Sequence, residues 1–325
     1  MPDFSAVQAA VEVSNIADMA ILIGDETGLL FSYEKGSFTV DQSVSIASAS
    51  KMVFGLVIWD LIETGDLSRT DNPQDYIDFW TGIAGDARSE ITIDQLLGFT
   101  SGFNQPPDEP GCVGDRQVSL QDCVQTIYED GLDTLPGTAY SYGPEHMQIA
   151  ALMAVGATGQ TNADLLNERI IQPLGMSAVT RYRIVAGDNP RYSGAMVSTA
   201  QDYGLLLTAL MDGRLVSDRA GYLEDRTSAV SFAYRPGDVG GKDWHYGFGF
   251  WKECDDLQYT ANCDERPTIS SPGTLGFTPW IDFDTGYWGI IAMEEVQING
   301  DPAAAVSVQL EQEVQPLIEA ALAGN

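Results

Sequence analysis

Segments that resemble β-strands lie near both ends of the chain, and the long stretch between them has helical patterns. Near the N-terminus, a helical pattern at 4–15 is followed by apolar segments at 19–23, 28–33 and 37–40, with turn signals at 24–26 and 34–36. Near the C-terminus, strand patterns at 246–251, 278–283 and 287–293 are followed by a helix at about 302–322. We therefore predict an α+β fold in which helices flank an antiparallel sheet built from both termini.

The region between these segments is predicted to be an inserted, mostly helical subdomain. A helical pattern at 51–64 precedes this region, and helical patterns at 93–97, 120–129, 145–155, 163–171 and 199–211 lie within it, divided by loops rich in glycine and proline. No internal repeat, low-complexity segment or exposed linker divides the chain. We expect one unit over residues 1–325, with an α/β subdomain at 1–71 and 222–325 and a helical subdomain at 72–221.

The net charge is −31, because 47 aspartates and glutamates outnumber 16 lysines and arginines. Such a field repels nucleic acid, so no nucleic-acid partner is expected. The acidic residues are scattered, which is typical of a solvated surface. No run of 18 or more apolar residues occurs, so membrane insertion is not expected. The first residues lack the pattern of a secretory signal, although a mature exported protein would lack it too.

Four cysteines form two close pairs, Cys112 with Cys123 and Cys254 with Cys263. Neither pair has C-x-x-C spacing, and the two histidines lie near neither pair in the sequence, so no metal site is expected. Two short-loop disulfides are the favoured interpretation, and four buried thiols are the alternative. Disulfides would indicate a secreted or periplasmic protein, whereas thiols would leave a cytoplasmic location open.

The segment Ser48-Ala49-Ser50-Lys51 places a serine and a lysine three residues apart at the predicted start of a helix. In the first turn of a helix these positions share a face, so the hydroxyl and the amine can meet. A serine becomes a strong nucleophile when a base takes its proton, and a buried lysine with a lowered pKa can be that base. The helix N-terminus would also favour an oxyanion. Ser48 is the candidate nucleophile.

The S-x-x-K spacing alone is a weak signal, because it is also that of a helix cap followed by a surface lysine. A second copy, Ser32-Tyr33-Glu34-Lys35, occurs in the same chain. It lies in a predicted strand and turn, where positions i and i+3 point to opposite faces of the sheet. We therefore discount this copy as a catalytic motif.

Four later segments strengthen the first motif. They are Ile91-Thr92-Ile93-Asp94-Gln95-Leu96-Leu97-Gly98-Phe99-Thr100-Ser101-Gly102, Pro136-Gly137-Thr138-Ala139-Tyr140-Ser141-Tyr142, Ile171-Gln172-Pro173-Leu174-Gly175-Met176 and Val197-Ser198-Thr199-Ala200-Gln201-Asp202. In this order, over nearly the whole chain, they resemble the landmarks of the β-lactamase-related serine hydrolases. This family contains class C β-lactamases, D-alanyl-D-alanine carboxypeptidases and family VIII carboxylesterases. The resemblance implies a serine β-lactamase-like fold, although Phe99 stands where the family commonly has histidine.

The resemblance also implies a catalytic role for Tyr142. In the family, the tyrosine of a Y-x-N element shares a proton with the lysine and the serine, and the asparagine helps to hold the lysine and a substrate amide. Here the element reads Tyr142-Gly143-Pro144. A proline cannot make either hydrogen bond of the asparagine side chain, so Pro144 is a departure in the substrate-binding region.

The family's K-T-G or H-x-G element aligns with Ser271-Pro272-Gly273-Thr274. Ser271 stands where a lysine normally binds the carboxylate of a β-lactam or peptide, which argues against those anionic substrates. Gly273 permits close backbone approach to a substrate. The resemblance implies that the Thr274 N–H joins the Ser48 N–H in an oxyanion hole.

Other catalytic designs are poorly supported by the sequence. No G-x-S-x-G elbow occurs, and His146 and His245 are the only candidates for a Ser-His-Asp triad. We predict that both histidines are structural, with His146 bordering the pocket as the alternative. The segment 103–135, which contains Cys112 and Cys123, is predicted to form a wall of the substrate pocket pinned by a disulfide.

These features together predict a serine hydrolase that forms an acyl-enzyme on Ser48, with Lys51 and Tyr142 handling the proton and no cofactor. The favoured substrates are small or medium carboxylic esters, because an alkoxide leaving group needs less precise protonation than an amine. The alternatives are a β-lactamase, a D-amino-acid peptidase or another amide hydrolase. A non-catalytic binding or sensor protein on the same fold is the alternative of a different class.

Overall fold

The computed structural model describes residues 2–103, 111–183, 187–236, 239, 241–255, 258–265 and 267–324. The helices are α1 (Ser5–Val13), α2 (Ser50–Thr64), α3 (Ile93–Leu97), α4 (Leu120–Asp130), α5 (Glu145–Thr158), α6 (Asn162–Leu166), α7 (Gln172–Leu174), α8 (Ala200–Met211), α9 (Arg219–Tyr222), α10 (Ala261–Glu265) and α11 (Ala303–Ala323). Short helical turns are η1 (Ala47–Ala49), η2 (Pro73–Asp75), η3 (Ala87–Glu90) and η4 (Asn167–Ile171). The strands are β1 (Met19–Asp25), β2 (Gly28–Lys35), β3 (Val44–Ser45), β4 (Ala139–Ser141), β5 (Arg181–Tyr182), β6 (Met196–Ser198), β7 (Ser231–Tyr234), β8 (His245–Tyr246), β9 (Trp251–Lys252), β10 (Thr268–Ser270), β11 (Thr278–Asp282), β12 (Tyr287–Ala292), β13 (Gln297–Ile298) and β14 (Asp301–Pro302).

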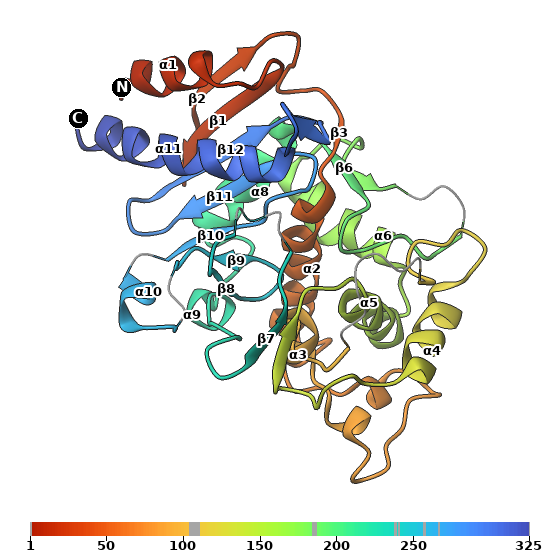
Figure 1. Cartoon of the computed structure of the whole chain (residues 1–325). Helices are drawn as coiled ribbons and strands as arrows, with labels where there is room; N and C mark the ends of the chain where they lie inside the picture. The colour runs from red at the N-terminus through yellow and green to blue at the C-terminus, as the bar shows by residue number, and fades with distance from the viewer. Residues whose placement is uncertain are drawn as a thin grey trace.

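The main sheet joins strands from both ends of the chain, which confirms the predicted fold class. Its strand order is β2-β1-β12-β11-β10-β9-β8, and every neighbouring pair is antiparallel. At the centre, Ile21 of β1 faces Ile291 of β12. Figure 1 shows this sheet in the upper left, with the helical segments α3 to α6 lying to its right.

The two faces of β1 contribute to two separate cores. Met19, Ile21 and Ile23 pack with residues of α1 and α11, whereas Ala20 and Leu22 pack with residues of α2 and α8. Alternate side chains of a strand point to opposite faces, so a continuous apolar segment is buried on both sides. The helices α1 and α11 thus cover one face of the sheet, and α8 lies behind the other (Figure 1).

The helix α2 carries the S-x-x-K motif into the interior. Eleven of its fifteen residues are buried, including Lys51, and its apolar residues belong to the core that joins the sheet to the helical segments. Burying a leucine or isoleucine side chain stabilises a fold by about 1.5–3 kcal/mol. The helix ends at Gly65, which has a left-handed φ of 82°, a common way to terminate a helix.

Two predicted strands differ from the structure. Residues 37–40 form no strand, because the chain leaves the sheet after β2 and runs to β3, which pairs with β6 just before Ser48. The predicted strand at 246–251 is a tight hairpin in which β8 and β9 pair antiparallel. Its turn is closed by a 2.9 Å hydrogen bond from Gly247 N to Phe250 O. The turn residues are buried, so their apolar character resembled that of a strand.

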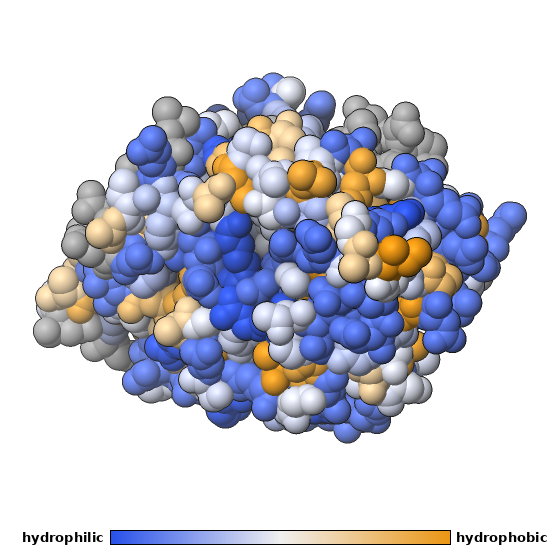
Figure 2. All heavy atoms as spheres, turned by 90° about the horizontal axis from the view of Figure 1, so that it is seen from below, coloured by the Kyte–Doolittle hydropathy of each residue, from blue (hydrophilic) through white to orange (hydrophobic). Residues whose placement is uncertain are grey.

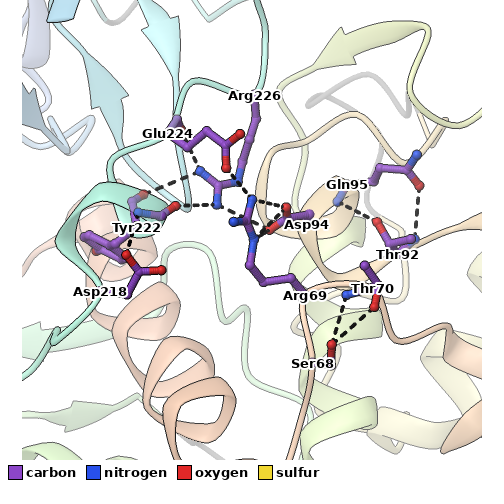
Figure 3. Close-up of polar contacts among 11 residues, drawn as sticks. Ser68, Arg69, Thr70, Thr92, Asp94, Gln95, Asp218, Tyr222, Glu224 and Arg226 are labelled. Atoms are coloured by element: carbon purple, nitrogen blue, oxygen red, sulfur yellow. Dashed lines mark hydrogen bonds and ion pairs between the residues drawn. The ribbon is translucent and has the colours of Figure 1, made fainter.

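An ion-pair network fixes α3 against the segment that follows α9 (Figure 3). Arg69 donates three hydrogen bonds to Asp94 and one to Glu224, and Arg226 Nη2 lies 3.3 Å from Asp94 Oδ1. At the start of α3, Thr92 and Gln95 form a reciprocal capping box. This network holds the chain that leads from α3 to Phe99 beneath the candidate site.

The face shown in Figure 2 is largely hydrophilic, with apolar side chains in small groups. In the described ranges, no helix combines the length and the apolar character needed to cross a bilayer.

Candidate active site

Ser48 lies in the η1 turn, immediately before α2. The preceding residue, Ala47, has a φ of 45°, a conformation that costs energy for a residue with a side chain. Surrounding contacts hold it: Ser50 Oγ donates to Ala47 O at 2.6 Å, and Met196 N donates to Ser50 Oγ at 3.1 Å. Tyr203 OH donates to Ala49 O at 2.9 Å. The turn leaves Ser48 half-buried while its neighbours on both sides are buried.

The predicted meeting of Ser48 and Lys51 occurs. Lys51 Nζ lies 2.9 Å from Ser48 Oγ and also donates to the backbone carbonyl of Ser193 at 2.7 Å. The lysine side chain is buried, so the amine is held close to the hydroxyl by a fixed backbone acceptor. This geometry allows the amine to receive a proton from the hydroxyl.

Tyr142 lies beside this pair. Its ring centroid is 4.4 Å from Lys51 Nζ. The ring stacks on Trp251, with centroids 5.5 Å apart, and meets the edge of Phe99 at 5.4 Å. Phe99, where the related motif commonly has histidine, also stacks on His146 at 4.8 Å. This aromatic packing fixes the orientation of Tyr142.

The loop after β10 approaches Ser48 from the sheet. Ser271 is buried and donates through its hydroxyl to the Ser48 carbonyl at 2.9 Å, a contact that the sequence did not predict. A Cβ on Gly273 would clash with the carbonyl oxygen of Ile46, so only glycine fits there. Both residues hold the sheet against the turn that carries Ser48. Their contacts with a substrate remain predictions.

A pocket of about 250 Å³ opens above the serine. Its described lining residues are Ala47, Ser48, Lys51, Tyr142, Gly143, Pro144, Arg191, Ser193, Gly194, Tyr234, Pro236 and Thr274. The structure therefore brings together the predicted catalytic residues with Pro144 and Thr274. Ser271 and Gly273 support the site from behind and are not among these lining residues. The predicted oxyanion hole stays a prediction, although both of its residues line the pocket.

Glu145 follows Pro144, and its carboxylate lies next to Gly143 of the pocket, since a Cβ built on Gly143 would be 2.6 Å from Glu145 Oε2. Its side chain is 6% exposed, and its Oε2 has no hydrogen-bond partner in the described part of the chain. Burial raises the pKa of its carboxyl to about 7, and the positive charge of Arg191 opposes that rise. The carboxyl therefore changes charge near neutral pH, close to the candidate catalytic residues.

Replacing Glu145 with glutamine is expected to remove a pH dependence of stability. The folded protein favours the neutral carboxyl, so the stability is fully present below about pH 4.5, the ordinary pKa, and is lost as the pH rises through about 7. At pH 9 the variant should be more stable than the wild type by about 3 kcal/mol, whereas the two should nearly agree at pH 4. Urea unfolding at both values measures the difference.

Glu26→Gln, in the exposed turn between β1 and β2, provides the matched control for losing one carboxylate. This control should change stability little at either pH. Equal pH dependence in the wild type and Glu145→Gln would contradict the assignment of Glu145 as the titrating group.

The two histidines are held in structural contacts. His146 is fully buried between Ser101 Oγ at 2.8 Å and Ser141 O at 2.9 Å, and burial lowers its pKa to about 4. His245 is buried beside Thr227 Oγ1 at 3.1 Å. Neither is among the described residues that line the pocket. The geometry thus gives no support for a histidine-based triad.

The two cysteine pairs lie at disulfide distance. The Cα atoms are 5.1 Å apart in Cys112–Cys123 and 5.2 Å apart in Cys254–Cys263. This pairing points to an oxidising compartment, extracellular or periplasmic. The predicted pocket wall at 103–135 lies partly outside the described residues, because 104–110 are not described. In the ranges that are described, no group of three or more histidine, cysteine or acidic side chains could hold a metal ion.

An antiparallel sheet flanked by helices, with a serine–lysine pair at the start of a buried helix, defines the serine β-lactamase-like class. The family described as Beta-lactamase matches residues 5–310. The chain therefore belongs to the Beta-lactamase family, which confirms the resemblance found in the sequence motifs.

Solved structures show the same fold over nearly the whole chain. A putative β-lactamase from Bacteroides dorei DSM 17855 is 27% identical with a TM-score of 0.81, covering 98% of this chain and 99% of that one. EstCE1, a hydrolase with promiscuous acyltransferase activity, is 17% identical with a TM-score of 0.72, covering 98% and 97%. A D-stereospecific amidohydrolase from Streptomyces sp. is 19% identical with a TM-score of 0.69, covering 97% and 98%.

Curated relatives match over shorter stretches. Protein flp from Staphylococcus aureus (strain MW2) is 27% identical over 135 residues, which is 42% of this chain and 27% of that protein. Penicillin-binding protein 4 from Amycolatopsis lactamdurans is 24% identical over 177 residues, 53% of this chain and 46% of that protein. The matched part thus spans less than half the length of each of these two relatives.

Several residues at the site escaped the sequence analysis. The acceptor for Lys51 at Ser193 is a backbone carbonyl, which any residue type provides, so no sequence signal marks it. Trp251 contacts Tyr142 only because the β8–β9 hairpin brings it there. Arg191 and Glu145 carry charges in no known motif of the sequence. For Glu145, the one sequence signal that could have marked it is its position directly after the Tyr142-Gly143-Pro144 element.

Proposed function

We propose that this member of the Beta-lactamase family is a serine hydrolase that acts on carboxylic esters through an acyl-enzyme on Ser48. The observation that carries the proposal is the 2.9 Å contact between Lys51 Nζ and Ser48 Oγ at the base of an open pocket. A buried amine at this distance can take the hydroxyl proton as Ser48 attacks an acyl carbon. The proposal needs no metal or cofactor.

In the proposed reaction, the Ser48 oxygen adds to the ester carbonyl and its proton passes to the Lys51 and Tyr142 pair. The carbonyl oxygen becomes an oxyanion that the N–H groups of Ser48 and Thr274 would stabilise. The intermediate collapses, the alkoxide leaves with the proton, and an acyl-enzyme remains. Water then attacks the acyl carbon and gives a proton to the same pair; the bond between the acyl carbon and Ser48 Oγ breaks, the pair returns the proton to Ser48 Oγ, and the acid leaves. Lys51 Nζ lies against the Tyr142 ring, so we assign the base to the pair.

The preference for esters rests on two positions around the serine. Pro144 offers no side-chain hydrogen bond to a substrate amide, and Ser271 offers no positive charge to the carboxylate of a β-lactam. Amides and β-lactams therefore lose contacts that an ester does not need. The relatives include proteins described as β-lactamases, a penicillin-binding protein and an amidohydrolase, so amide hydrolysis is the alternative to be tested.

A comparison of substrates tests the proposal. We expect p-nitrophenyl acetate and butyrate to be hydrolysed with a kcat/KM at least about 10-fold above that for nitrocefin, since each missing polar contact disfavours a substrate that requires it. Rates of release of nitrophenolate and of opened nitrocefin measure the difference at one pH. Faster nitrocefin opening would assign the protein as a β-lactamase. Stoichiometric acylation without turnover would assign it as a sensor.

A further inference from the structure

One cation in the pocket has no part in the proposed mechanism. Arg191 lines the pocket that contains Ser48 and Lys51, and its residue is exposed. Lys51 is already bound to Ser48 Oγ and Ser193 O. In the described ranges, no ion pair or side-chain hydrogen bond involves the Arg191 guanidinium, although this chain has 47 acidic residues. An arginine left uncommitted in a pocket can bind an anion through several N–H donors.

The backbone beneath Arg191 is held in place by its neighbours. Gly194 N and Ala195 N both donate to Arg191 O, at 3.0 and 2.8 Å. On either side of Arg191, the buried side chain of Gln148 bonds to Asn189 Oδ1 at 2.7 Å and to Tyr192 N at 3.1 Å. The loop is therefore fixed on both sides of the arginine while its side chain is not. Binding would therefore order the arginine side chain but not its backbone.

The arginine side chain lies close to the η1 turn, which carries Ser48. A Cβ built on Gly194 would be 3.4 Å from Arg191 Cδ and 3.9 Å from the backbone carbon of Ala47, the residue before Ser48. Arg191 and the η1 turn thus both lie next to Gly194. Because Arg191 and Ser48 line the same pocket, a substrate whose acyl carbon is bonded to Ser48 would have its substituents in the pocket that Arg191 lines.

The carboxyl of Glu145 does not cancel this charge under weakly acidic conditions. Its pKa is raised to about 7 by burial, so it is largely neutral below that pH. Arg191 does not replace the family's lysine at position 271. Ser271 lies in the loop after β10, and its buried hydroxyl is bonded to the Ser48 carbonyl. Among the described residues, the positive charge of the pocket without an ion-pair or hydrogen-bond partner is therefore at Arg191, where the family's lysine motif does not lie.

We propose that Arg191 determines specificity by binding a carboxylate on the ester substrate, so that the enzyme prefers esters of this anionic class over neutral ones. This inference rests on the proposed function. The arginine acts on a substituent and takes no part in proton transfer. A charge-assisted, bidentate contact of this kind should change kcat/KM by roughly 10- to 100-fold.

Two matched pairs of esters test the inference at an ionic strength of about 0.15 M, where the field of the whole protein is screened beyond about 8 Å. The first pair is the mono-p-nitrophenyl ester of adipic acid and its methyl ester, which differ by a carboxylate in the acyl part. The second is 3-acetoxybenzoate and its methyl ester, which differ in the alcohol part. We expect a higher kcat/KM for the anionic member in at least one pair. A preference in the first pair would place the carboxylate contact of Arg191 in the acyl part, and a preference in the second pair would place it in the alcohol part.

Arg191→Gln should lower kcat/KM for the preferred anionic ester by roughly 10- to 100-fold and change the neutral partner less than about twofold. Arg191→Lys should restore part of the preference. Arg181→Gln, an exposed arginine on β5 outside the pocket, removes the same charge and should change neither ester. An equal loss for both members of each pair, or no preference in the wild type, would overturn the inference.

Binding of boronic acids separates this inference from the proposed function. A boronic acid can add to a reactive serine without turnover, so the dissociation constants of 3-carboxyphenylboronic acid and phenylboronic acid report on the pocket even if no ester is hydrolysed. The carboxylated compound should bind roughly 10-fold more tightly to the wild type, and Arg191→Gln should abolish the difference. Equal affinities in the wild type would overturn the role of Arg191. Tighter binding of the carboxylated compound without ester turnover would refute the esterase proposal and leave the role of Arg191 in binding a carboxylate supported.

Discussion

Ser48→Ala is expected to reduce ester kcat by roughly 10⁴- to 10⁶-fold, because it removes the atom that forms the acyl-enzyme. The substitution deletes one oxygen from a half-buried position and also the contact to Lys51 Nζ. The fold should persist, since the hydrogen bonds that hold the η1 turn come from Ser50, Tyr203 and Ser271. Initial rates with p-nitrophenyl butyrate, together with a thermal unfolding curve, measure both effects.

The second S-x-x-K copy provides a matched control for this experiment. Ser32 lies in β2, three residues before Lys35, and has the same spacing in a strand instead of at the start of a helix. Ser32→Ala should retain the activity of the wild type. If Ser48→Ala kept substantial ester turnover while remaining folded, another residue would be the nucleophile and the site assignment would be wrong.

Lys51→Met is expected to lower kcat/KM by about 10²- to 10⁴-fold, the usual contribution of general acid–base catalysis. Methionine has a similar length and suits a buried position, but it cannot accept a proton or bond to Ser193 O, which Lys51 contacts at 2.7 Å. The buried carbonyl left without its partner should cost about 1–3 kcal/mol of stability. Activity and the free energy of unfolding are therefore measured on the same preparation.

Lys35→Met is the control for the loss of a lysine. Lys35 Nζ binds the backbone carbonyls of Val11 and Ser14, both at 2.9 Å, so this substitution also leaves carbonyls without a partner. It should reduce stability while leaving kcat/KM close to that of the wild type. If the two lysine variants lost activity in proportion to their stability, Lys51 would be a structural residue and not the proton acceptor.

The main sheet shows which strands local sequence patterns can predict. The segments that became β1, β11 and β12 were predicted within two residues at each end, because each is a long apolar segment bounded by turn residues. The predicted strand at 37–40 was wrong because exposed Ser37 and Thr39 alternate with buried Phe38 without forming a strand. The one at 246–251 was wrong because a buried hairpin has the same apolar composition as a buried strand. Pairing partners, not composition, distinguish the two.

Some contacts of the candidate site could likewise be predicted from the sequence and others could not. Ser48 and Lys51 could be brought together from their spacing alone, since helical geometry fixes the distance between positions i and i+3. Tyr142 and Thr274 entered only through resemblance to a family, and the structure places both at the same pocket. The supporting contacts of Ser271 and Gly273 could not be predicted, because each depends on a backbone carbonyl far away in the sequence.

The sequence by itself determined the fold class, the two close cysteine pairs and the serine–lysine pair, because local periodicity and short spacings encode these features. The tertiary structure alone decided that Ser193 O holds Lys51, that Trp251 stacks on Tyr142 and that Arg191 faces the pocket. These contacts join residues from 109 to 142 positions apart, and the packing of a loop or hairpin against α2 and β4 sets them. A side chain's neighbours across such separations follow from how whole elements pack, which no local pattern records.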